Sequence, residues 1–385
     1  MGWAKELRIE EEEQGYSNPP EYDVCADMFP SHAMVRDFIK GKGHQGVCHF
    51  TKKHTVVLSL KDLLRFIYDE FRTYYEDPAN ECGFSSSNDD DEYKDTGWHK
   101  DYGYILPDSR TVQTTKEVFV KEHFSSKSKD LDMIIYSNLS CDNWVQVSPY
   151  GNTPTEELVF QWEKFSQDTI NSIKSNVTFK NTCSKFFGRL SNILYTIEKN
   201  KDLLFENLSI GTILYRCVNY RNPPVLNISS LASPPTKKTT ANRFSQTGKS
   251  RFYASFDEET PLVEATNNDA TMKHCIGKFE LIEEVKVLNL KKLPSPVFLN
   301  VKDYWGFKFL HSFAQAISSY VPENDKTRYI PTQVMTEVFE NKLSNNQILG
   351  IKYGSSKSKG LGNVVLFLDQ SACPNFMKLV DSCIK

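Results

Sequence analysis

The chain has 385 residues, which is more than one typical domain and predicts two or three. Hydrophobic residues make up 39% of the chain and charged residues 25%, so ordinary globular cores can form. The formal net charge of −3 argues against a nucleic-acid-binding protein that relies on bulk positive charge.

Cysteine usage and the N-terminal sequence indicate a cytoplasmic protein. The nine cysteines are widely spaced, and the polar, acidic N-terminal residues do not resemble a signal peptide. We therefore expect reduced thiols. No apolar run approaches the roughly 20 residues that a membrane span needs, so we expect no membrane association.

Residues 1–81 predict a small compact module followed by a helix. The expected elements are, in order, a helix at 33–39, a turn at 41–46, a strand at 54–60 and a helix at 60–75. Alternating apolar residues predict the strand, and apolar residues at helical spacing predict the long helix. Residues 82–103 are acidic and rich in Ser and Gly, which is typical of a solvated loop.

Two cysteines of the N-terminal module have the placement of a degenerate zinc ribbon. Cys25 and Cys48 stand where each knuckle would have its first cysteine, but Met28 and Thr51 occupy the partner positions. A structural zinc site needs four suitable ligands. The nearby histidines, whose spacing matches no standard site, are His32, His44, His49 and His54. We therefore expect no bound metal.

Residues 82–150 predict an acidic loop and an irregular segment, and residues 151–205 predict a helical region. Thr153-Pro154 is a helix start signal, and the residues after it are amphipathic. Residues 183–198 continue the helical pattern. A metal-free ribonuclease with a histidine shortly after an arginine is a rival interpretation of a helical region, but Arg36 to His44 is too wide and Arg189 has no histidine within reach.

Residues 206–385 predict an α+β domain in which strands and helices alternate. The expected elements are a strand at 209–220, a breaker-rich loop at 221–240, a strand at 251–256, a helix capped by Thr260 with Pro261 in its first turn, a long strand or hairpin at 274–294, helices at 305–321 and 328–343, and a strand–loop–strand finish at 348–370.

Candidate site residues gather between Asn242 and Ala265, where Arg243, Tyr253 and Glu264 stand on a loop, a strand and a helix. Each alone has an ordinary explanation, such as a surface cation or a first-turn carboxylate. Together they suit a nucleotide whose glycosidic bond is broken. An arginine fork binds phosphate, an aromatic ring stacks on a heterocycle, and a carboxylate stabilises an oxocarbenium-like centre.

The segment from about 208 to 370 resembles the RES domain. The matching blocks are LYR at 214–216, residues 242–265, YIPTQ at 329–333 and ILGIKYGSSKSKGLGNVVLF at 348–367. The N-terminal half resembles the HEPN/RES-type region found ahead of RES domains in longer members. This resemblance implies a mixed sheet with helices, similar in its core to ADP-ribosyltransferases, and an enzyme that consumes NAD as substrate.

The resemblance also implies four catalytic residues. Arg243 would grip a phosphate or ribose of NAD, and Tyr253 would line the pocket. Glu264 would polarise the nicotinamide ribose and its developing positive charge. Ser355 would be the serine of the family name.

Three further residues would contact the substrate, namely Arg216 as a second basic group, Asn242, and Ser356 as the alternative to Ser355. Family members often have proline before the serine, where this chain has Gly354. That departure does not remove the catalytic set, and the choice between the two neighbouring serines stays open.

We expect a toxin-type enzyme that cleaves the nicotinamide–ribose bond as a glycohydrolase or phosphorylase, in toxin–antitoxin or antiphage defence, with a regulatory N-terminal half. Two alternatives stay open: a protein mono-ADP-ribosyltransferase, and a non-catalytic RES-like interaction module. The expected partners are NAD and an antitoxin or trigger molecule. Self-association into a homo-oligomer is left open, and nucleic acid is not an expected partner.

Overall fold

The computed structural model describes residues 11, 14–78, 84–85, 99–100, 103–105, 112–147, 162, 164–167, 183–265, 271–299, 301–319, 321, 325–343, 347–355 and 362–385. The chain divides into two compact units. Unit 1 comprises residues 1–152 with 294–304, and unit 2 comprises residues 153–293 with 305–385. Both mix helices with strands, which confirms the α+β class. The division into four segments stays a prediction.

Unit 1 is built from short strands and helices. They are β1 Asp23–Cys25, η1 Ala26–Met28, α2 Ala33–Lys42, β2 His44–Val47, β3 His54–Ser59, α3 Leu60–Arg72, β4 Tyr75–Glu76, β5 Phe84–Ser85, β6 His99–Lys100, β7 Gly103–Ile105, β8 Gln113–Thr114, α5 Thr115–Lys121, α6 Lys129–Asn138, β9 Asn143–Gln146 and η4 Pro296–Phe298. The predicted strand and helix on either side of Ser59 are confirmed. Ser59 ends the strand and caps α3, since its Oγ accepts a hydrogen bond from the backbone N–H of Asp62 at 3.2 Å.

Two predictions for unit 1 are wrong. Instead of a turn at 41–46, α2 runs on to Lys42 and β2 then pairs with β3 in the sheet β1-β3-β2. Pairing with β3 gives the backbone groups of β2 partners that a turn would leave to water. The described residues of the predicted loop at 82–103 include strands β5 and β6 and the first residue of β7. These three strands form a sheet of order β5-β7-β6.

The two cysteines of the predicted zinc knuckle are buried, free thiols. Cys25 and Cys48 are both buried, and Cys25 Sγ lies 3.6 Å from Thr51 Oγ1. The neighbouring histidines have other contacts: His49 stacks on a tyrosine ring at 3.6 Å, and the His32 ring lies 4.9 Å from a phenylalanine ring. Among the described residues, no cluster of three or more His, Cys, Asp or Glu side chains has the arrangement to hold a metal. The zinc-ribbon likeness stays a prediction.

Unit 2 contains the larger sheet. Its elements are α8 Cys183–Lys199, α9 Lys201–Leu204, β10 Phe205–Leu208, β11 Ile213–Tyr220, α10 Ile228–Leu231, η3 Thr236–Lys238, β12 Phe252–Ser255, α11 Glu259–Ala265, β13 Lys273–Leu281, β14 Val285–Asn289, α12 Val301–Ser318, η5 Lys326–Tyr329, α13 Ile330–Lys342, β15 Ile348–Tyr353, β16 Asn363–Leu366, α14 Cys373–Phe376 and β17 Met377–Ile384, where α12 starts within the residues of unit 1. No helix among the described residues combines the length and apolar character needed to cross a membrane.

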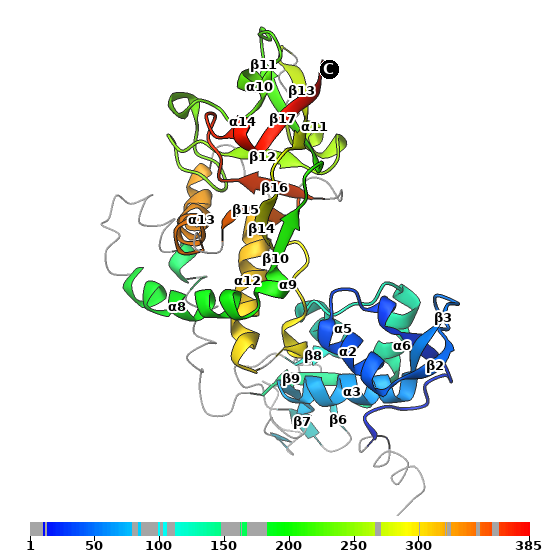
Figure 1. Cartoon of the computed structure of the whole chain (residues 1–385). Coiled ribbons are helices and arrows are strands. Elements are labelled where there is room, and N and C mark those ends of the chain that lie inside the picture. Colours follow the sequence, from blue (N-terminus) through cyan, green and yellow to red (C-terminus); the bar gives the residue numbers. More distant parts are fainter. Residues whose placement is uncertain are drawn as a thin grey trace, which may run out of the picture. The chain divides into compact units, whose positions relative to one another are not determined.

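The eight strands of unit 2 have the order β10-β14-β15-β16-β12-β11-β13-β17. All neighbours are antiparallel except β14 and β15. The joint between β12 and β11 is narrow, since its register has one pair, Tyr215 with Ser255. Figure 1 shows α12 and α13 beside the β14–β15 end of this sheet. The sheet therefore consists of two parts that meet at one short joint.

Most of the predicted elements of unit 2 are confirmed, and three predictions need correction. The stretch 274–294 is not one strand or a hairpin, because β13 and β14 lie in different parts of the sheet. Helix α11 begins at Glu259, and its buried Thr260 is not the cap: the Asp257 carboxylate accepts the Thr260 backbone N–H at 2.8 Å. A charged carboxylate is the stronger acceptor there. The predicted breaker-rich loop holds the short helix α10.

The helical region before the sheet is described only in part. The start signal at Thr153-Pro154 lies outside the described residues. Trp162 and residues 164–167 are helical, and the Trp162 ring packs edge-on against Phe309 at 5.5 Å between centroids. Helix α8 confirms the predicted helix at 183–198.

Candidate active site

Neighbouring strand ends in unit 2 bring the polar candidates together. Ser255 at the end of β12 pairs with Asn363 at the start of β16, and Asn363 pairs with Tyr353 at the end of β15. Residues directly opposite each other in antiparallel strands have neighbouring side chains. This row forms one edge of the site, and the chain continues from β15 directly into Ser355.

The carboxylate of Glu264 is held by two neutral donors. Glu264 is on the last turn of α11, and its Oε1 accepts the Ser355 hydroxyl at 2.6 Å and the Asn363 amide at 2.7 Å. Asn363 is 1% exposed, and its own amide oxygen accepts the Ser255 hydroxyl at 2.7 Å. The side chains of Ser255, Asn363 and Glu264 thus form a chain of hydrogen bonds that fixes the carboxylate.

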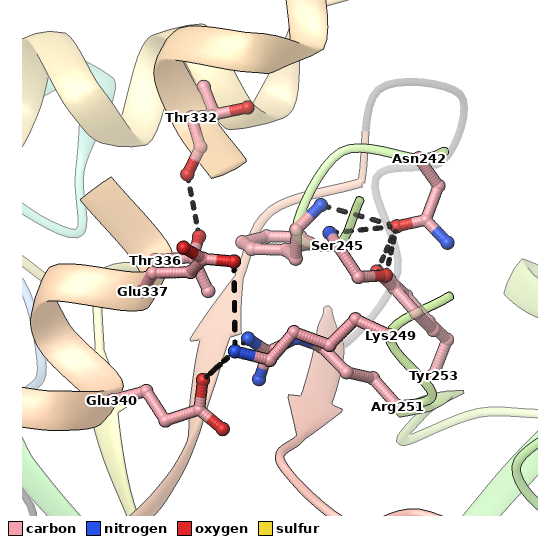
Figure 2. Close-up of polar contacts among 10 residues, drawn as sticks. Asn242, Ser245, Lys249, Arg251, Tyr253, Thr332, Thr336, Glu337 and Glu340 are labelled. Atoms are coloured by element: carbon pink, nitrogen blue, oxygen red, sulfur yellow. Dashed lines mark hydrogen bonds and ion pairs between the residues drawn. The ribbon is translucent and has the colours of Figure 1, made fainter. Parts of the chain in front are cut away.

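The phenol of Tyr253 is held by the loop that precedes β12. Its hydroxyl donates to Asn242 Oδ1 and lies 3.0 Å from Ser245 Oγ. The same Asn242 oxygen accepts the backbone N–H of Phe244 at 3.3 Å and that of Ser245 at 3.2 Å. Figure 2 shows Asn242, Ser245 and Tyr253 converging on this oxygen. Burial raises the pKa of Tyr253 to about 12, so the phenol is a neutral donor at physiological pH.

Arg243 is anchored from two sides. Its guanidinium donates to the carbonyl of Ile317 and lies over the Tyr329 ring, 5.8 Å from the centroid. Its backbone carbonyl accepts the hydroxyl of Thr332 at 2.7 Å. The arginine therefore has a fixed base at the junction of α12, η5 and α13.

Arg216 braces the narrow joint of the sheet. It is on β11, and its guanidinium Nη1 donates to the carbonyl of Tyr253 on β12 at 2.8 Å. The guanidinium lies 5.6 Å from the centroid of the Phe252 ring. Burial lowers the pKa of Arg216 from its usual value, but an arginine stays charged throughout the physiological range. Arg216 thus joins the two parts of the sheet at the backbone of Tyr253.

Tyr353 is a buried residue of the site that the sequence did not single out. Its ring packs on Phe244 at 4.6 Å. Burial raises its pKa well above the usual value, the charge of Glu264 raises it further, and Arg243 acts in the opposite direction. The Tyr353 phenol is therefore within electrostatic reach of both predicted charged residues.

The structure thus groups Glu264 with Ser355, and Tyr253 with Asn242 and Arg216, while Tyr353 lies within reach of Glu264 and Arg243. Ser356 lies outside the described residues. Sequence patterns missed Ser255, Asn363, Tyr353 and Gln333. The last belongs to the YIPTQ block, which was noted without a role, so the block itself was the available signal.

Comparison with protein families matches two segments of the chain. Residues 41–175 match the HEPN/RES N-terminal domain 1, and residues 213–379 match the RES domain. The second segment contains every described candidate residue of the site. Neither the curated proteins nor the solved structures contain a match to the chain.

Proposed function

Because the chain is a RES-domain protein with a HEPN/RES N-terminal domain 1 ahead of the RES domain, we propose that it cleaves the bond between nicotinamide and ribose in NAD. RES domains are associated with NAD-acting toxins. The observation that carries the proposal is the carboxylate of Glu264, fixed by Ser355 and Asn363 within electrostatic reach of the Tyr353 phenol.

Cleavage breaks one C–N bond. The bonding pair leaves with the nicotinamide nitrogen, and positive charge develops on the ribose as an oxocarbenium-like centre. A carboxylate in a fixed position stabilises that charge more in the transition state than in bound NAD, which is the condition for catalysis. Glu264 has this role, and its hydrogen bonds from Ser355 and Asn363 hold it in position.

The remaining residues bind and orient the substrate. Arg243 offers a planar guanidinium to phosphate oxygens, and Arg216 adds a second positive charge beside β12. Tyr253 lines the pocket with a neutral ring whose hydroxyl is held by Asn242. An additional contact from Asn242 or Ser356 to the substrate is part of the same proposal.

The acceptor decides the reaction class. After the C–N bond breaks, the oxygen of water or phosphate, or a protein side chain, adds to the ribose and loses its proton. The test is to incubate the purified chain with NAD, with and without phosphate, and to identify the products by mass spectrometry. Nicotinamide release that Glu264→Ala and Arg243→Ala both abolish supports the proposal. Undiminished release from these variants overturns it.

We also propose that the N-terminal region restrains the enzyme and recognises a trigger, because free NAD cleavage would kill the cell that makes it. In unit 1 a cavity of about 590 Å³ lies against the stacked rings of Tyr22 and His49, a size typical of small-molecule sites. The test is to express residues 205–385 and the full chain at matched levels in cells. Equal toxicity of the two contradicts a restraining role.

A further inference from the structure

Helix α13 has a stripe of polar side chains on the face that packs against residues 242–251. Thr332, Gln333, Thr336 and Glu340 are spaced at one helical face, and the first three are at most 4% exposed. A buried amide or hydroxyl is costly unless it is hydrogen-bonded, so this stripe needs partners. Thr336 donates to the carbonyl of Thr332 within the helix at 2.7 Å. The other three side chains have partners in residues 242–251.

Gln333 makes the central contact. It is 2% exposed, and its Nε2 donates to the carbonyl of Asn242 at 2.6 Å and to the carbonyl of Ser245 at 3.1 Å. The backbone N–H of Asn242 also donates to the Ser245 carbonyl, at 2.9 Å. One side-chain amide thus closes both ends of a four-residue turn.

This turn contains Arg243 and holds the phenol of Tyr253, two groups that the proposed reaction uses. Arg243 is its second residue, and the Asn242 side chain at its start accepts the Tyr253 hydroxyl. Thr332 adds a contact to the carbonyl of Arg243 at 2.7 Å. A shift of the turn would therefore displace the guanidinium and release the phenol together.

The far end of the same segment is fixed by charge. Glu340, seven residues after Gln333 on α13, bonds to Lys249 at 2.6 Å and to Arg251 at 2.8 Å. Figure 2 shows Lys249 and Arg251 lying between Glu340 and the Asn242–Tyr253 group. With its far end held, the segment has its remaining freedom at the turn that Gln333 closes.

We propose that Gln333 is a positioning residue of the NAD-cleaving site, which sets Arg243 and Tyr253 through the Asn242 turn and makes no contact with the substrate. This inference rests on the proposed function. It gives the YIPTQ block a structural role, because the block provides the amide that orders the loop of the site.

The test uses the full chain with Gln333→Glu and Gln333→Leu. Glutamate keeps the size of the side chain but places an acceptor against two carbonyl oxygens, and leucine removes the donor. The kcat for nicotinamide release should fall about 10- to 100-fold, since a displacement of about 1 Å has that effect, while KM changes by less than about threefold. The matched control is Gln370→Glu, whose exposed amide donates to the Ser229 carbonyl at 2.8 Å away from the site.

Hydrogen exchange gives a readout that is independent of activity. In both Gln333 variants the amides of Asn242, Phe244 and Ser245 should exchange faster than in the wild type, while the strand amides of β12 stay protected. If neither the wild-type chain nor residues 206–385 release nicotinamide, the proposed function is refuted, and the exchange result still tests the positioning role. Unchanged exchange at 242–245, or a kcat no lower than in Gln370→Glu, overturns the inference.

Discussion

Two glutamates of unit 2 accept hydrogen bonds from different kinds of donor. In the Glu264 cluster (Ser255, Glu264, Ser355 and Asn363), the carboxylate accepts hydrogen bonds from a hydroxyl and an amide. In the Glu340 cluster (Lys249, Arg251 and Glu340), the carboxylate accepts them from two cations. Neutral donors orient a carboxylate without adding a positive charge, whereas cations also balance its negative charge. The first arrangement suits chemistry on a developing cation, and the second suits stability.

The pKa of Glu340 is consistent with this difference. Burial acts to raise the pKa, but the bonds from Lys249 and Arg251 outweigh burial and hold it below its ordinary value. The Arg251 side chain is 0% exposed and lies over the Phe367 ring at 4.4 Å. Glu340 therefore balances the charge of the buried Arg251 guanidinium.

The largest expected effect separates the two clusters by activity. Glu264→Gln keeps the size of the side chain and removes the negative charge from the site of the developing cation. We expect kcat for nicotinamide release to fall about 100- to 1000-fold, the usual effect of removing one electrostatic group from a transition state. The free energy of unfolding should change by less than about 1 kcal/mol.

The matched control is Glu258→Gln, which removes an exposed glutamate paired with Lys385 just before α11. Its activity should equal that of the wild type. A Glu264→Gln enzyme with more than about half of wild-type kcat would mean that the carboxylate has no catalytic role.

The second effect is on stability. Glu340→Gln leaves the buried charge of Arg251 without its counter-charge, and breaking a buried ion pair costs about 3 kcal/mol. Because Glu340 itself is 26% exposed, solvent reduces the expected loss to about 2 kcal/mol, measured by urea unfolding. Glu337→Gln, which removes a half-exposed partner 3.7 Å from Lys249, should cost less than about 1 kcal/mol. Equal losses in the two variants would contradict the assignment of the Glu340 cluster to stability.

Acidification tests the same cluster without changing its shape. The pKa of Glu340 is lower in the folded chain than in the unfolded chain, so the unfolded chain binds the proton first. The contribution of Glu340 to stability is therefore complete above the ordinary glutamate pKa of about 4.5 and is lost as the pH falls through the folded value. Unfolding free energies measured from pH 6 to pH 3 should fall less steeply in Glu340→Gln than in the wild type. Parallel curves would show that Glu340 is not the titrating group.

The smallest expected effect concerns the donor that orients Glu264. Ser355→Ala removes the hydrogen bond from the Ser355 hydroxyl to the carboxylate but leaves the charge and the Asn363 amide in place. We expect kcat to fall about tenfold, because one hydrogen bond to a charged carboxylate contributes about 1.5 kcal/mol. A loss as large as that of Glu264→Gln would indicate that Ser355 itself acts on the substrate.

Local patterns in the sequence predicted the elements that carry the site. Alternation gave β12, the Pro-Thr pair gave α13, and Arg243, Tyr253, Glu264 and Ser355 were all singled out. The residues that hold them were missed for a physical reason. Asn363 reaches Glu264 only because β16 pairs with both β12 and β15, and Gln333 reaches Asn242 across 91 positions of the chain.

Two of the errors in local structure, both in unit 2, have the same origin. The stretch that forms β13 and β14 alternates strongly on both sides of residues 282–284, and the sheet order places its two halves apart. Thr260 resembles a cap, but the helix begins one residue earlier and the Asp257 carboxylate accepts the backbone N–H of Thr260 itself. Both structures depend on hydrogen-bond partners that the local sequence pattern does not reveal.

The most direct measurement is nicotinamide release from NAD by the purified full chain, by residues 206–385 and by Glu264→Gln in both, followed by chromatography. We expect release from the wild-type RES unit, equal or lower release from the full chain, and a loss of at least about 100-fold in each Glu264→Gln protein. Absence of release from both wild-type proteins, or equal release from the wild type and Glu264→Gln, would contradict the account.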